Sequence, residues 1–191
     1  MTTAVHDFLF ETLSMKAVGI LLGMLLVSSH VWALIKRDQV QTMLKSFPRN
    51  RRSGVVLTLI NALFAFVLMS EIDMGEFFHL RNKVLIVIPV ATFLVIRFCD
   101  EFLAVRALGT LLLLLAAPIL DCAFMQPQAS RLLLPVLAYG WIITGLFWVG
   151  LPYLMRDAID WVSAREWRWK TACLAGSGYG VALFLAATAS Y

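Results

Sequence analysis

The chain has 191 residues, of which 61% are hydrophobic and 15% are charged. Soluble domains contain about 45–50% apolar and about 25% charged residues, so this composition excludes an ordinary soluble protein. The net charge of +4 does not indicate a nucleic-acid partner, because membrane proteins also retain basic residues in their cytoplasmic loops. At about 20 apolar residues per crossing, the length predicts one all-α integral membrane domain over 1–191, with about six transmembrane helices.

Charged residues divide the chain into apolar stretches that predict these spans. The first two spans are expected at about 16–35 and 53–70, and the last two at about 132–155 and 171–190. The middle of the chain has two shorter apolar runs, and we expect them to extend to about 77–98 and 102–124 with their charges at the interfaces.

A re-entrant hairpin over 84–120 is the alternative for this middle region. It would place four charges near the centre of the bilayer, Arg97, Asp100, Glu101 and Arg106. Each would cost roughly 2.5–3.5 kcal/mol, so we favour two full helices. Both alternatives return the chain to the same side of the membrane.

The basic residues predict the orientation. Six spans place twelve of the 16 Lys and Arg residues on one side and four on the other, so the richer side is expected to be cytoplasmic. Both termini then lie outside an inner (plasma) membrane. The first span is expected to remain as an anchor, because Asp7 and Glu11 precede Lys16 whereas a cleavable signal begins with basic residues.

Short interfacial helices are expected in the first and last cytoplasmic loops. In the first, Val40, Met43, Leu44 and Phe47 recur at helical spacing. Four basic residues around it are candidates for contact with anionic lipid headgroups: Lys45, Arg49, Arg51 and Arg52. The alternative is that they serve only as an orientation signal. In the last loop, three tryptophans, Trp161, Trp167 and Trp169, are expected to anchor the chain at the interface.

A weak polar layer inside the membrane is the main candidate site. Its residues are His30, Asn61, Thr58 and Ser177. His30 and Asn61 are both expected about 7–12 Å from the cytoplasmic boundary, at 1.5 Å per residue. They could form a small polar cavity in which His30 binds a ligand or carries a proton and Asn61 orients it. The alternative, which we favour, is an interhelical hydrogen bond that packs the first two spans.

Small residues on single helix faces predict close helix packing. Gly19 and Gly23 share a face with His30, and Gly176 and Gly180 are expected to let a neighbouring helix approach. Two further faces are expected to pack in the same way, Gly54, Thr58, Asn61 and Ala65 in the second span and Gly140 with Thr144 in the fifth.

Catalytic residues, a cofactor and a metal are not expected. One intramembrane histidine cannot make a bis-histidine haem site. Glu76 and His79 have the spacing of half of a carboxylate–histidine metal site. Together with Glu71 and Asp73, they are better explained as a solvated acidic loop. Gly176-Ser177-Gly178 has no nearby acid that would complete a serine triad.

Three functions remain. The first is a non-enzymatic accessory or assembly subunit of a membrane complex, which contacts the lipid bilayer and other membrane subunits or copies of itself. The second is a small permease or lipid-handling protein that uses the polar layer. The third is a membrane enzyme at the cytoplasmic interface, with a site that uses Asp100, Glu101, Asp157 or Asp160. These carboxylates could equally be solvated residues at the ends of loops, which we favour.

Overall fold

The computed structural model describes residues 14–71, 75–99, 101–124 and 126–189. All regular elements of these residues are helices, and six of them are long and apolar enough to span a membrane. The long helices are α2 (Met15–Ile35), α4 (Arg51–Glu71), α5 (Arg81–Phe98), α6 (Leu103–Ala123), α7 (Leu133–Gly150) and α9 (Glu166–Ala189). The short helices, with η marking 3₁₀ helices, are α3 (Arg37–Ser46), η2 (Phe47–Arg49), η3 (Gly75–Leu80), η4 (Ala129–Leu132) and α8 (Tyr153–Ser163).

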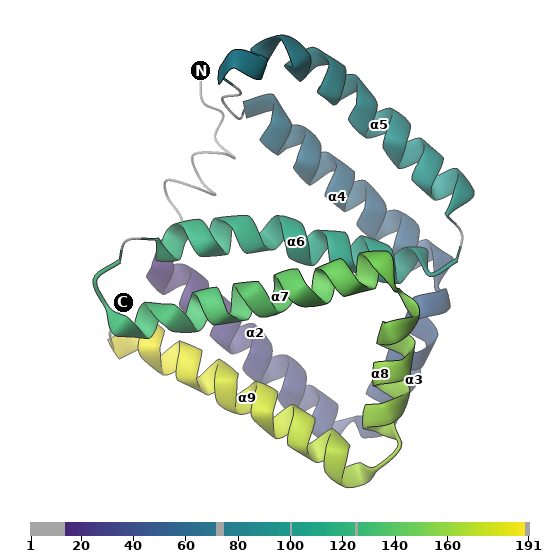
Figure 1. Ribbon diagram of the computed structural model, residues 1–191. Coiled ribbons are helices and arrows are strands. Elements are labelled where there is room, and N and C mark those ends of the chain that lie inside the picture. Colours follow the sequence, from purple (N-terminus) through teal and green to yellow (C-terminus); the bar gives the residue numbers. More distant parts are fainter. Residues whose placement is uncertain (1–13, 72–74, 100, 125, 190–191) are drawn as a thin grey trace.

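The long helices pack as three pairs: α2 with α9, α6 with α7, and α4 with α5. Figure 1 shows the first two pairs meeting near the C-terminus and diverging toward α8, which lies beside α3 across the wide end. We call this wide end the α3–α8 end. The third pair is attached through α4, which packs on α6.

Glycines allow the closest approaches between helices within the pairs. A Cβ atom on Gly23 of α2 would lie 2.9 Å from the carbonyl oxygen of Gly180 on α9. A Cβ on Gly145 of α7 would lie 2.7 Å from the carbonyl oxygen of Gly109 on α6. The expected role of Gly180 is therefore confirmed. Gly140 is different, since a Cβ there would meet nothing within 4 Å among the described residues. The predicted packing face of Gly140 therefore makes no close contact within this chain, and Gly145 provides the close contact of α7 with α6.

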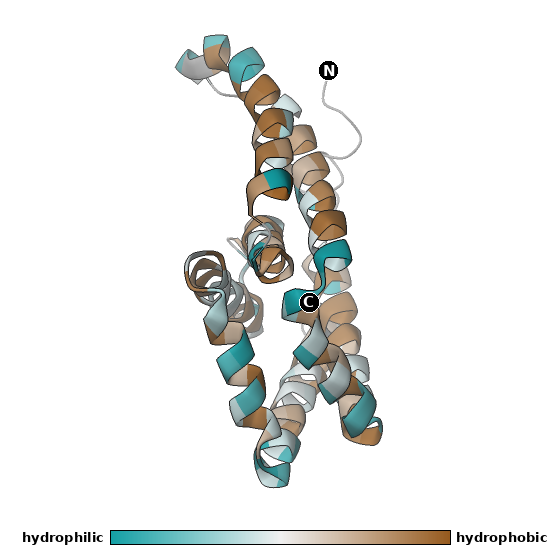
Figure 2. Cartoon of the chain, turned by 90° about the vertical axis from the view of Figure 1, so that its right-hand side faces the viewer, coloured by the Kyte–Doolittle hydropathy of each residue, from teal (hydrophilic) through white to brown (hydrophobic). Residues whose placement is uncertain are grey.

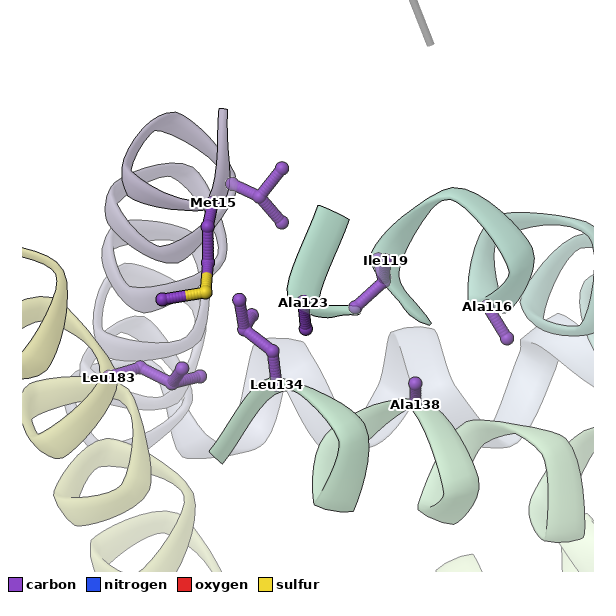
Figure 3. Close-up of a cluster of buried hydrophobic side chains, with 8 residues drawn as sticks. Met15, Ala116, Ile119, Ala123, Leu134, Ala138 and Leu183 are labelled. Carbon is purple, nitrogen blue, oxygen red and sulfur yellow. The ribbon is translucent and has the colours of Figure 1, made fainter. Parts of the chain in front are cut away.

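A hydrophobic cluster joins the first two pairs at the end away from α3 and α8. Figure 3 shows Met15 and Leu183, from α2 and α9, beside Leu134 of α7 and Ala123 of α6. Leu134 and Leu183 are completely buried. Because close packing supplies most of the attraction between helices in lipid, this cluster fixes the narrow end of the molecule.

α5 is the least embedded of the long helices. None of the 18-residue apolar window of α5 is buried, whereas 44% of the corresponding window of α6 is buried. Arg81, at the start of α5, donates to the backbone carbonyls of Ser70 and Met69 at the end of α4. This contact holds the start of α5 against the end of α4. Figure 1 shows both helices diverging from α6.

The middle region contains two separate long helices, and their packing favours two full spans over a re-entrant hairpin. α5 packs on α4, and α6 packs mainly on α4 and α7. Two short helices that turned back on each other within the membrane would pack together instead. Each helix also has the length of a full crossing, as the cost of burying the intervening charges predicts.

The two predicted loop helices are present as α3 and α8. The fifth span is shorter than expected, because α7 ends at Gly150 and Tyr153 to Met155 belong to α8. The break falls at Leu151 (φ −127°, ψ 67°), which precedes Pro152, and a residue before proline avoids the helical region. The long helices in Figure 2 are mainly hydrophobic along their length, with hydrophilic residues concentrated at helix ends and on the short helices.

Candidate functional site

His30 and Ser177 lie at the contact between α2 and α9. The Nδ1 atom of His30 is 2.8 Å from the carbonyl oxygen of Leu26, so this nitrogen carries the proton. The ring lies against Gly176, where an added Cβ would clash with Nε2. Ser177 follows Gly176 and donates to the carbonyl oxygen of Cys173, at 2.8 Å. The histidine therefore fills the space that a glycine leaves on the facing helix.

Thr58 and Asn61 lie at a different contact, between α4 and α6. Thr58 donates to the carbonyl oxygen of Gly54 in its own helix, at 2.8 Å. Asn61 is only 6% exposed, and its Nδ2 donates to the carbonyl oxygen of Ala107 across the interface, at 2.7 Å. Its Oδ1 is buried without a hydrogen-bond partner.

The structure thus does not bring His30 and Asn61 together. α2 packs on α9 and α4 packs on α6, so neither the predicted cavity nor the predicted hydrogen bond between the first two spans is formed. The rise of 1.5 Å per residue gives the depth of a residue in the membrane, but it does not say which helix lies beside it. The four polar residues are therefore divided between two parts of the structure, with His30 and Ser177 on α2 and α9 and Thr58 and Asn61 on α4.

Next to His30 is a groove of about 360 Å³ under α3, with mostly apolar walls from α2, α3 and α9. Trp169 is one of its walls and is 5% exposed. Its Nε1 donates to the carbonyl oxygen of Ala33, at 3.1 Å. Trp169 therefore ties α9 to α2, and its predicted place among the interfacial anchors is wrong, because its indole is buried in the protein.

Trp161 and Trp167 remain on the surface and are each 58% exposed. The guanidinium of Arg168 lies between them, with its carbon 4.3 Å from the centroid of Trp161 and 5.5 Å from that of Trp167. Such amphipathic rings with a cationic neighbour are typical of the boundary between lipid and water.

A basic cleft of about 190 Å³ lies at the α3–α8 end. Its walls include Lys45 and Arg49, which were expected to bind lipid headgroups, and also Arg156 of α8. Arg156 pairs with Asp157, at 2.9 Å between Nη2 and Oδ1, and both side chains are about half exposed. Arg51 and Arg52 lie on the first turn of α4 and do not line the cleft. The predicted basic group is therefore divided between a cleft and a helix end.

Phe102 also lines this cleft, and no pattern in the sequence predicts it there. It has φ 55° and ψ 28°, a left-handed conformation that is unfavourable for a bulky residue. Its carbonyl oxygen accepts from the backbone N–H groups of Val105 and Arg106, which begins α6. The chain thus reverses within four residues between α5 and α6, at the cost of strain at Phe102.

Two of the carboxylates considered for an enzyme site lie on α8. Asp157 is paired with Arg156, and Asp160 lies in the basic cleft. Among the described residues, there is no group of three or more His, Cys, Asp or Glu that could hold a metal ion. Asp73 and Asp100, both considered above, lie outside the residues that the structure describes.

Comparison with known proteins adds no assignment: no protein-family model matches the chain, and no curated protein or solved structure matches it.

Proposed function

We propose that this protein is a non-enzymatic accessory or assembly subunit of a membrane complex, and that the α4–α5 pair is where another subunit binds. The supporting observation is the poor packing of α5 within its own chain. It packs on α4 and the connecting η3, and grooves of about 430 and 300 Å³ lie on the two sides of the α4–α5 contact.

Poor packing matters more in a membrane than in water. Lipid chains are as apolar as leucine, so helices associate through close van der Waals contact and interhelical hydrogen bonds rather than through hydrophobic burial. The surface of α5 carries large exposed side chains, including Phe93 (67%) and Ile86 (66%). A helix from a second protein would supply the contacts that α5 lacks.

The permease alternative loses its main support, because His30 and Asn61 lie at different helix contacts. In the proposed assembly the α3–α8 end is cytoplasmic, the termini are outside and α3 and α8 lie in the headgroup region. The basic cleft and the exposed Trp161 and Trp167 support this placement. The excess of Lys and Arg in the loops on one side fits a location in an inner membrane.

Purification from native membranes in a mild detergent tests the proposal. A photo-reactive residue at Phe93 should crosslink to a second protein present in stoichiometric amount, whereas the same residue at Leu185 of α9 should not. Leu185 is a matched control, since it is 58% exposed on a helix that is already paired. A monodisperse monomer, with equal crosslinking to lipid at both positions, would contradict the subunit proposal.

A further inference from the structure

The groove of about 300 Å³ between α4, α5 and α6 contains an arginine. The wall contributed by α6 is a stripe at helical spacing: Leu103, Arg106, Ala107, Thr110 and Leu114. At 1.5 Å per residue this stripe is about 16 Å long, close to half of the roughly 30 Å hydrocarbon core. The groove therefore has the length of one leaflet.

Two buried polar atoms of this groove have no hydrogen-bond partner among the described residues: Nε of Arg106 and Oδ1 of Asn61. The threonines that line the groove cannot donate to Oδ1 of Asn61. Each hydroxyl already donates to the carbonyl four residues earlier in its own helix: Thr58 to Gly54, Thr92 to Ile88 and Thr110 to Arg106. A buried donor on a cation and a buried acceptor are costly to leave unpaired, and both point to a ligand.

Arg106 lies near one end of the groove, next to Leu103 at the start of α6. Arg106 is in the first turn of α6, which begins at the α3–α8 end, and helical side chains tilt toward the N-terminus. Its guanidinium is thus directed toward the headgroup level, while the groove continues toward Leu114 and Ala65. The larger groove on the other side of the α4–α5 contact is lined only by uncharged residues of α4 and α5.

We propose that this groove binds one anionic phospholipid from the leaflet at the α3–α8 end. The phosphate accepts from Arg106, a hydroxyl of the headgroup or glycerol donates to Asn61, and one acyl chain lies along the α6 stripe. Charge complementarity favours an anionic lipid, since a guanidinium and a phosphate make strong charge-assisted hydrogen bonds. The site does not depend on the subunit proposal and could exist in a monomer.

Native mass spectrometry of the full chain tests this site, with phosphatidylglycerol and phosphatidylcholine of matched chains as probes. One phosphatidylglycerol should be retained per chain where phosphatidylcholine is lost. Arg106→Gln should lower the retention about tenfold, which is the loss of one charge-assisted hydrogen bond. Arg97→Gln is the matched control, because Arg97 lies in the last turn of α5 without lining the groove, and it should have no effect.

A second pair of variants separates binding from folding. Ala65→Phe should fill the groove without changing any charge and should abolish retention, while Val56→Phe on the exposed face of α4 should not. If Arg106→Gln does not fold, this pair decides the question. The proposal would be overturned if both lipids were retained equally, or if the two variants of either pair had equal effects. Full displacement of phosphatidylglycerol by inorganic phosphate would also overturn it.

Discussion

His30 shows how a single glycine can determine where a polar side chain lies. The imidazole is held by the carbonyl of Leu26 and lies against Gly176, with no room for a Cβ atom. In a protein interior, even one extra methyl group forces side chains or backbone to move. The contact is therefore steric, and it explains the position of His30 without a ligand.

Gly176→Ala should lower the free energy of unfolding in detergent by about 1–3 kcal/mol, because the added Cβ meets the ring. Gly178→Ala is the control in the same helix, since nothing lies within 4 Å of its Cβ, and it should be neutral or stabilising. Adding His30→Ala to the Gly176→Ala variant should relieve the loss. A loss that persists in the double variant would show that the contact is not its cause.

Phe102 gives a second prediction at this scale. Its left-handed backbone suits glycine, so Phe102→Gly should be more stable than Phe102→Ala by about 1 kcal/mol. Both variants remove the ring, so lost packing in the basic cleft cancels in the comparison. Chemical unfolding of the two variants measures the difference, and an alanine variant as stable as the glycine variant would argue against strain at this position.

At the scale of elements, hydropathy predicted the long helices because an apolar stretch must be long enough to cross the bilayer. It did not predict their partners. The periodicity of α2 identified the face with Gly23 and His30, but the facing glycines are on α9, more than 140 residues away. The break before α8 could have been found at Pro152, since the apolar run continues through it and only backbone sterics end α7 there.

The same reasoning explains why the predicted polar cavity does not exist. Depth placed His30 and Asn61 at one level, and small residues placed each on a packing face. Both statements agree with a contact between α2 and α4, and equally with the observed contacts to α9 and α6. Asn61 was correctly identified as a residue at a helix contact, and its partner, the Ala107 carbonyl, is a backbone group that no side-chain pattern reveals.

The seam between α6 and α7 carries a prediction about a whole element. Gly145→Ala should destabilise this pair by about 1–3 kcal/mol, because its Cβ would meet the Gly109 carbonyl. Gly140→Ala, in the same helix but facing open space, should not. Thermal unfolding in detergent compares them. The opposite ranking would mean that α6 and α7 approach through another face.

For the molecule as a whole, the three helix pairs are joined at different ends. The Leu134 and Leu183 cluster joins α2–α9 to α6–α7 at the narrow end, while Gly54 packs on Ala104 at the α3–α8 end. The α4–α5 pair is therefore the part that a partner or a lipid can reach with least disturbance of the remainder. The subunit proposal predicts that substitutions on the exposed surface of α5, such as at Phe93, change binding more than stability.

The orientation of the whole chain is the central claim, because the cytoplasmic headgroup contacts and the leaflet of the bound lipid both follow from it. Labelling of introduced cysteines in intact cells tests it directly, in a background where Cys99, Cys122 and Cys173 are replaced by alanine. An impermeant maleimide should label the Ala129→Cys variant between α6 and α7, and it should label the Ala164→Cys variant between α8 and α9 only after the membrane is opened. Labelling of Ala164→Cys in intact cells, with Ala129→Cys protected, would contradict the account.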